Sequence, residues 1–128
     1  MSPETPQVCE HMSRDVVTVL ATATLGEVAR TIRARNVGSA VVLDGGNAPL
    51  GLISERELVD SVAASRNPDQ GQAGSWMRRD GVDSVSPKAS LVDASRAMRD
   101  AGVRHLTVVE DNAVVGVISI RDILAALD

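Results

Sequence analysis

An internal repeat constrains the fold of this chain more than any other feature of its sequence. An offset of 65 or 66 residues pairs Met12 with Met77, Leu25 with Leu91 and Gly51 with Gly116, and it changes only in loops. Chance similarity does not keep one register along a whole segment, so the chain contains one unit twice. With 128 residues in the chain, each unit has about 50 to 60 residues and buries only a small share of its surface. We therefore expect the two copies to pack on each other.

The composition limits which side chains can form the core and which kinds of partner the chain can bind. The chain has no Phe or Tyr and a single Trp, so aliphatic side chains must form the core. A net charge of -4 opposes binding to nucleic acids. The single cysteine rules out an internal disulfide and is typical of a reducing compartment. No apolar run approaches the roughly 18 residues of a membrane span, and the N-terminus lacks the pattern of a signal peptide. We expect a cytoplasmic protein with no nucleic-acid or membrane partner.

The first copy predicts the order strand, helix, strand, strand, helix. The β-branched residues 16–19 are typical of a strand, and Thr24-Leu-Gly-Glu27 has the pattern of a capping box at the start of a helix. Asn36 follows that helix, at a position where a left-handed residue is favoured. The remaining expected elements are the two strands of a hairpin and a second helix, at 37–43, 50–54 and 55–64.

The second copy repeats these signals. Ser90-Leu-Val-Asp93 again has the capping-box pattern, and Gly102 lies where Asn36 ends the first helix. A short helix is expected at 8–12. The second hairpin and the last helix are expected at 103–110, 113–119 and 120–127. We expect one domain pair over 1–128, composed of a first motif at 8–64, a polar connector at 65–75 and a second motif at 76–128.

Three segments resemble a known family. They are Gly51-Leu-Ile-Ser-Glu-Arg-Glu-Leu58, Gly116-Val-Ile-Ser-Ile-Arg-Asp-Ile123 and Gly102-Val-Arg-His-Leu-Thr-Val108. Both repeats are similar to CBS motifs, and the pair resembles a Bateman module, the tandem arrangement in which such motifs usually occur. The resemblance implies an α/β (α+β) fold of two tandem β-α-β-β-α motifs, packed through their sheets with pseudo-two-fold symmetry. It also implies a non-catalytic regulatory or sensor module rather than an enzyme.

Ser119 and Asp122 are candidates for ligand binding. A helix N-terminus presents free N–H groups and the positive end of the helix dipole, so a phosphate fits beside Ser119. The Asp122 carboxylate can accept hydrogen bonds from two vicinal ribose hydroxyls. The same Ser-x-x-Asp pattern is also a capping box, in which both side chains only satisfy backbone donors. The residues alone leave both interpretations open.

The resemblance implies two clefts, each combining the strand-to-helix corner of one repeat with the early strands of the other. In the second cleft, Glu57 replaces the family's Asp, while Arg104 and His105 suit a phosphate tail. The expected ligand contains adenosine and is AMP, ADP, ATP or S-adenosylmethionine. The first set of site residues is Thr18, Val19, Gly38, Ser39, Ala40, Ser119, Arg121 and Asp122. The second set is Ser54, Arg56, Glu57, Ser84, Val85, Pro87, Arg104 and His105.

Cys9 and His11 predict neither a metal site nor a catalytic pair. Zinc requires four ligands, and the only other histidine is His105. Residues two positions apart on a helix do not face each other, so Cys9 and His11 cannot act together. We expect no metal, no catalytic residue and no required cofactor.

The absence of an effector domain from this sequence suggests that a signal passes to another chain. Modules of this kind commonly form homodimers, so we expect a second copy as partner, or an effector protein. The alternative is a ligand-free module of the same fold that serves only dimerisation or protein interaction. Binding of a nucleotide distinguishes the two.

Overall fold

Two three-stranded sheets organise the fold. The structure is a computed structural model that describes residues 6–79 and 84–127. The chain divides into two units, which we name after one carboxylate in each. The Glu57 unit is Val17–Asp80, and the Asp122 unit is Met1–Val16 together with Gly81–Asp128. The mixed α and β class that the sequence predicts is confirmed.

The sheet of the Glu57 unit has one parallel and one antiparallel pairing. Strand β1 (Thr18–Leu20) lies parallel to β2 (Ser39–Leu43), and β2 pairs antiparallel with β3 (Pro49–Ser54). A parallel pair requires a crossover, which α1 (Leu25–Arg35) provides. Helix α2 (Glu55–Ala63) follows β3 without a loop. The predicted order of elements is therefore confirmed.

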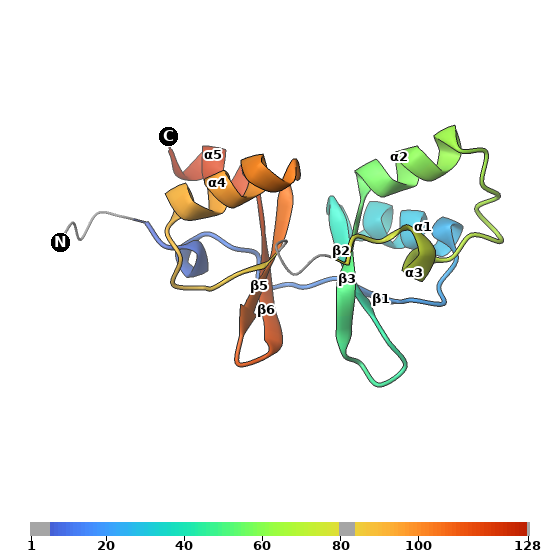
Figure 1. The fold of residues 1–128 in the computed structure, drawn as a ribbon, viewed down its shortest axis with the longest axis horizontal. Coiled ribbons are helices and arrows are strands. Elements are labelled where there is room, and N and C mark those ends of the chain that lie inside the picture. Colours follow the sequence, from blue (N-terminus) through green and yellow to red (C-terminus); the bar gives the residue numbers. More distant parts are fainter. Residues whose placement is uncertain (1–5, 80–83, 128) are drawn as a thin grey trace. The chain divides into compact units, whose positions relative to one another are not determined.

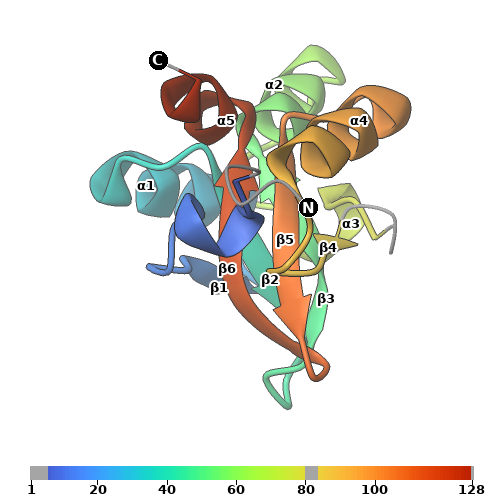
Figure 2. The same cartoon turned by 90° about the vertical axis from the view of Figure 1, so that its left-hand side faces the viewer.

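The Asp122 unit repeats this topology. Strand β4 (Ser84–Val85) lies parallel to β5 (His105–Glu110), with α4 (Leu91–Ala101) between them in the chain, and β5 pairs antiparallel with β6 (Ala113–Ser119). Helix α5 (Ile120–Ala126) follows β6 directly. In Figure 2 the turn between β5 and β6 lies at the opposite end of the hairpin from α4 and α5.

The helix ends follow the sequence signals closely. The Thr24 hydroxyl accepts a hydrogen bond from the Glu27 N–H at 3.1 Å, and the Ser90 hydroxyl accepts one from the Asp93 N–H at 3.0 Å. Both first helices end on a left-handed residue. In most residues the Cβ atom raises the energy of the left-handed conformation. Glycine has no Cβ atom and asparagine tolerates this conformation, so these two residue types determine where the helices stop. The residues are Asn36 with φ 55° and Gly102 with φ 68°.

Strand β1 begins at Thr18, not at Val16 as predicted. Val17 is buried in the core, and its carbonyl oxygen accepts a hydrogen bond from the Val41 N–H at 2.8 Å. The chain therefore joins the parallel ladder at Val17, and Val16 belongs to the Asp122 unit.

The segment before each repeat lies in the unit of the other repeat, and we call these two stretches, 6–13 and 73–79, the exchanged segments. The 3-10 helix η1 (Val8–Glu10) lies in the Asp122 unit, where the Val8 N–H donates to the Ala89 carbonyl at 2.8 Å. Helix α3 (Ala73–Trp76) lies in the Glu57 unit, where the Ala73 N–H donates to the Ala23 carbonyl at 2.9 Å. Figure 1 shows the blue η1 turn beside the orange elements, and α3 contacts β1, β3 and α2 of the Glu57 unit.

Helix α3 begins within 65–75, the stretch for which the sequence predicts a polar connector. Its equivalent in the first repeat is η1, since the repeat offset pairs Val8 with Ala73. Both residues are fully buried. The apolar side chain therefore holds each exchanged segment against a sheet, even where the surrounding sequence is polar.

Each exchanged segment also contacts the third strand of its sheet. Ser13 exchanges two backbone hydrogen bonds with Val117, and Arg78 exchanges two with Leu52. The neighbouring glycine permits this approach. A Cβ atom on Gly116 would lie 2.6 Å from Met12 Sδ and 2.8 Å from the Ser13 carbonyl oxygen.

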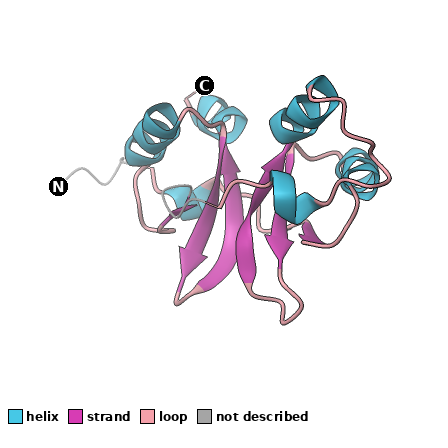
Figure 3. Cartoon of the chain, turned by 45° about the vertical axis from the view of Figure 1, so that its right-hand side comes forward, coloured by secondary structure: helices cyan, strands magenta, loops and turns pink. Residues whose placement is uncertain are grey.

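The buried apolar residues form one cluster in each unit. In the Glu57 unit, side chains of α1 and the sheet pack with Ala73 and Met77 of the exchanged segment. In the Asp122 unit, α4, α5 and the sheet pack with Val8. Figure 3 shows, for each unit, the hairpin turn at the end of the sheet away from the strand-to-helix corner.

Candidate functional site

The strand order of each unit brings three chain segments to one edge of its sheet. Because β1 and β2 are parallel and β3 is antiparallel, the starts of β1 and β2 lie beside the end of β3. Ser39 is therefore the partner of Ser54 in the ladder, and Thr18 is the partner of Val41. The strand-to-helix corner at Ser54 thus adjoins most of the small residues that the sequence singled out in the first repeat.

The Asp122 unit forms the same edge. His105 is the ladder partner of Ser119, and Ser84 is the partner of Thr107. The Ile120 N–H donates to the Arg104 carbonyl oxygen at 2.9 Å, which joins the start of α5 to the start of β5.

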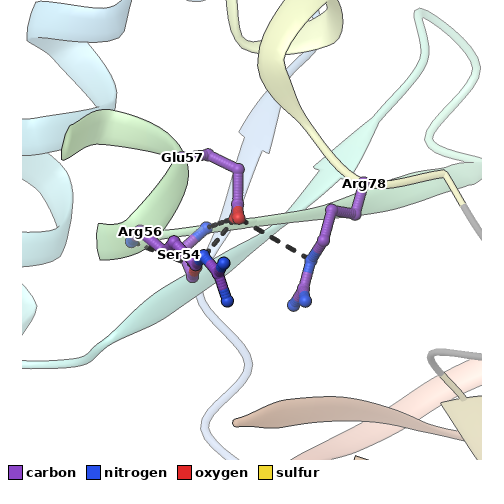
Figure 4. A network of polar contacts seen from close by, with 4 residues as sticks. All are labelled: Ser54, Arg56, Glu57 and Arg78. Carbon is purple, nitrogen blue, oxygen red and sulfur yellow. Dashed lines mark hydrogen bonds and ion pairs between the residues drawn. The ribbon is translucent and has the colours of Figure 1, made fainter. Parts of the chain in front are cut away.

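The Glu57 corner, shown in Figure 4, is buried and combines hydrogen bonds with an ion pair. Glu57 Oε1 accepts hydrogen bonds from the Ser54 N–H at 2.6 Å and from the Ser54 hydroxyl at 2.7 Å. Glu57 Oε2 lies 3.8 Å from Arg78 Nε. Glu57 is only 6% exposed and Ser54 only 4% exposed. The corner therefore holds a buried carboxylate whose two oxygens both have partners.

The Asp122 corner has the same cap in a more open setting. Asp122 Oδ2 accepts a hydrogen bond from the Ser119 N–H at 2.9 Å, and the Ser119 hydroxyl accepts one from the Asp122 N–H at 3.1 Å. Both residues are half-buried. Within the part of the chain that the structure describes, Asp122 has no ion pair. The capping-box interpretation of Ser119 and Asp122 is confirmed, and it engages only one carboxylate oxygen.

The other predicted site residues differ in exposure. Ala40 is buried on β2 and Pro87 is buried after β4, where its carbonyl oxygen accepts a hydrogen bond from the Cys9 N–H at 2.9 Å. The exposed members are Thr18, Arg56, Arg104 and Arg121, and the half-buried members include Val19, Gly38, Ser84, Val85 and His105.

Each predicted set of site residues is divided between the two units. Of the first set, Thr18, Val19 and 38–40 lie in the Glu57 unit, and Ser119, Arg121 and Asp122 lie in the other. The second set is divided in the same way. Within a unit, the structure brings together the corner and the early strands of the same repeat. The combination of halves from different repeats stays a prediction.

The sequence interpretation missed Arg78, the cation beside Glu57. The repeat offset pairs Arg78 with Ser13, and no sequence pattern marks that position as part of a site. Its role depends on the backbone pairing of Arg78 with Leu52, which is a long-range contact.

No helix within residues 6–79 and 84–127 has the length and apolar character of a membrane span. No group of three or more His, Cys, Asp or Glu side chains in these same ranges could hold a metal ion.

The chain is similar to proteins that contain CBS domains and to uncharacterized proteins. A family model for the CBS domain matches residues 8–64 and 73–128. An uncharacterized protein of Methanopyrus kandleri is 35% identical over 119 residues, which are 91% of this chain and 60% of that protein. The chain thus spans less than two thirds of that relative's length.

Two solved structures extend this result. A CBS-domain containing protein of Agrobacterium tumefaciens has a TM-score of 0.90 and 29% identity, and the alignment covers 100% of this chain and 98% of that one. A CBS domain protein of Pyrobaculum aerophilum, complexed with AMP, has a TM-score of 0.83 and 32% identity, with 94% and 97% of the two chains covered.

Proposed function

Since this chain belongs to the CBS domain family and carries the domain twice, we propose that it is a non-catalytic regulatory module that binds an adenosine-containing small molecule. The observation that carries the proposal is the AMP complex of the Pyrobaculum aerophilum protein, which is 32% identical over 94% of this chain. AMP is therefore the first ligand to test, followed by ADP, ATP and S-adenosylmethionine. Binding would alter contacts with a partner chain.

The Asp122 corner is the proposed ribose site. Its cap engages Asp122 Oδ2, so Oδ1 can accept hydrogen bonds from the ribose hydroxyls while the helix start stays intact. The Ser119 oxygen accepts the Asp122 N–H, which leaves the hydroxyl proton for a phosphate oxygen. Capping and ligand binding are thus compatible roles for the same two residues.

Positive charge near this corner favours the phosphate end of a nucleotide. Arg104 and His105, which the resemblance assigns to the other cleft, lie at the start of β5, and His105 is the ladder partner of Ser119. Arg121 lies in the first turn of α5 and is exposed. Charge-assisted hydrogen bonds from such groups are stronger than neutral ones. The remaining members of the first predicted set are proposed contacts that rest on the family resemblance: Thr18, Val19, Gly38, Ser39 and Ala40.

Thermal unfolding with and without nucleotide tests the proposal. A ligand at a hundredfold excess over its dissociation constant should stabilise the fold by about 2.7 kcal/mol. Asp122→Ala should lose this shift and remain folded. Asp93→Ala is the matched control, because Asp93 occupies the same capping position at the start of α4 and is exposed. A nucleotide shift that survives in Asp122→Ala would contradict the assignment of the ribose site.

A second copy of the chain is the proposed partner. Helix α2 exposes Val59 and Val62, and α5 exposes Leu124 and Leu127 at the equivalent positions of the repeat. Residues three apart lie on one helix face, so each of these pairs is an apolar surface. Val62 is 72% exposed and Leu127 is 71% exposed. Native mass spectrometry of the purified protein measures both the number of chains and any nucleotide that remains bound.

The alternative function is a ligand-free interaction module. The two complete capping boxes favour it, because both Ser and acid pairs already satisfy backbone donors without a ligand. This alternative predicts dimers that form without nucleotide and a melting temperature that none of the four ligands changes.

A further inference from the structure

We infer that Arg78 acts as an internal occupant of the Glu57 corner, so that each chain binds a single nucleotide, at the Asp122 corner. The inference rests on the proposed function, because it concerns the same ligand. It makes Arg78 a specificity-determining residue that no sequence signature marks.

The first observation is the state of the Glu57 carboxylate. Oε1 is taken by the N–H and the hydroxyl of Ser54, and Oε2 lies 3.8 Å from the Arg78 guanidinium. A carboxylate that is only 6% exposed requires compensating charge and hydrogen bonds, because burial disfavours an isolated ion. Arg78 supplies that charge from within the chain. At 3.8 Å, Arg78 Nε makes an ion pair rather than a hydrogen bond with Oε2, so it competes with ribose hydroxyls through its position and charge beside that oxygen.

The second observation is how firmly Arg78 is held. Its N–H donates to the Leu52 carbonyl oxygen, and its own carbonyl oxygen accepts from the Leu52 N–H, both at 2.9 Å. Leu52 lies on β3 close to Ser54, so this pairing delivers the Arg78 side chain to the corner. In Figure 4 the Arg78 side chain comes from the exchanged segment, and its Nε is the atom joined to Glu57. The side chain is 22% exposed, so the occupant is largely sheltered from solvent.

The third observation is the internal comparison that the repeat provides. Ser13 is the equivalent of Arg78 and makes the same two backbone hydrogen bonds, to Val117 at 2.9 and 3.0 Å. A serine side chain carries no charge and is too short to reach as a guanidinium does. Asp122 is accordingly without an ion pair among the described residues, and it is half-buried rather than buried. The residue at this position of the exchanged segment, together with Glu57 in place of an aspartate, therefore separates an occupied corner from a receptive one.

A rival interpretation gives Arg78 the opposite role. A guanidinium beside a binding corner could attract the phosphate of a nucleotide, so that Arg78 would promote binding instead of preventing it. The two interpretations predict opposite effects of removing the side chain.

Isothermal titration of the full chain with AMP distinguishes them. The wild-type protein should bind one AMP per chain. The double variant Arg78→Ser with Glu57→Asp gives the Glu57 corner the residues of the Asp122 corner, and it should bind two. When Asp122→Ala is introduced alone, the chain should bind no AMP. When it is combined with Arg78→Ser and Glu57→Asp, which define the converted chain, the protein should bind one AMP. Arg79→Ser is the matched control, because Arg79 is an exposed neighbour outside the pair and its removal should leave one site.

The reciprocal variant keeps the inference testable if the converted corner does not fold. Ser13→Arg places a guanidinium beside Asp122 and leaves the Glu57 corner unchanged. It should weaken AMP binding by about tenfold or more, since the new ion pair must be broken before ribose can bind. Circular dichroism of each variant verifies folding before titration.

The outcomes separate this inference from the proposed function. A wild-type chain that binds two AMP molecules overturns the inference and supports the function. A converted chain that gains no AMP, together with a Ser13→Arg variant that binds normally, also overturns it. If the single variant Arg78→Ser no longer binds AMP, the result supports the rival interpretation, in which Arg78 attracts the phosphate. A wild-type chain that binds no AMP refutes the proposed nucleotide-binding function. If the converted chain then gains AMP binding, that gain still supports the inference that Arg78 occupies the Glu57 corner.

Discussion

The Glu57 corner and the Asp122 corner share a backbone and differ in what surrounds the carboxylate. Each has a serine at the end of the third strand, an acidic residue three positions later, and a completed capping box. Glu57 is buried against Arg78, whereas Asp122 is half-buried and has no such cation among the described residues. Sequence duplication thus preserved the geometry of the corner, and a residue of the exchanged segment altered its chemistry.

The glycine beside each exchanged segment should show the largest difference between the units. A Cβ atom on Gly51 would overlap the Arg78 carbonyl oxygen, which is backbone held by two hydrogen bonds. On Gly116, the nearest atom is the flexible Met12 thioether, with the Ser13 carbonyl oxygen slightly farther away. We expect Gly51→Ala to cost about 3 to 4 kcal/mol of unfolding free energy and Gly116→Ala about 2 kcal/mol. Urea denaturation measures both, and equal losses would contradict the difference.

Removal of the two carboxylates should rank next. Glu57→Ala removes the acceptor of the buried Ser54 donors and the carboxylate beside the Arg78 guanidinium, and we expect a loss of about 2 to 3 kcal/mol. Asp122→Ala removes a half-buried cap residue, for which about 1 kcal/mol is typical. Glu57→Gln is the control that keeps an acceptor for Ser54 and removes the charge. A smaller loss of unfolding free energy in Glu57→Ala than in Asp122→Ala would contradict a stabilising role for the Glu57 corner.

The left-handed residues at the ends of α1 and α4 test whether the units also differ in backbone energy. A Cβ atom on Gly102 would meet nothing within 4 Å, so Gly102→Ala measures the conformation alone. We expect a cost of about 1 kcal/mol. Gly102→Asn copies the residue at position 36 and should cost only about half as much, because Asn tolerates this conformation. Chemical denaturation of the two variants decides the order.

The smallest effect on stability is expected at the exposed apolar pairs. Replacing Val59 and Val62, or Leu124 and Leu127, by serine should change the unfolding free energy by less than about 0.5 kcal/mol per site, because all four side chains are exposed. The leucine variant should shift the chain further toward the monomer, since leucine removes more apolar area from water in an interface. Sedimentation velocity of both double variants tests this order.

Local signals predicted most of the secondary structure. The capping box at Thr24, the Ser90 cap, the left-handed residues at 36 and 102, and the hairpins all have short-range causes. Helix α3 was missed because four residues within a polar stretch carry little periodicity of their own. Tertiary contacts stabilise that turn: Ala73 is buried in the Glu57 unit, and the Ala73 and Gly74 N–H groups donate to Ala23 and Ala21.

The candidate site was predictable in its residue types and not in its surroundings. The signature around Ser119 and Asp122 correctly predicted a strand-to-helix corner with a cap. No signal in the sequence showed that 6–13 joins the Asp122 unit or that Arg78 reaches Glu57. Both facts depend on pairings between residues far apart in the chain, where no local pattern specifies the partner.

The sequence by itself determined that one strand-helix-strand-strand-helix unit occurs twice, and where its helices begin and end, because those features follow from turn chemistry and side-chain periodicity over a few residues. The tertiary structure alone decided which segment completes each sheet and therefore which carboxylate faces a cation. The physical reason is that backbone pairing at an open strand edge has no sequence code of its own. It is selected by the apolar side chains that anchor each exchanged segment, Val8 in one unit and Ala73 with Met77 in the other.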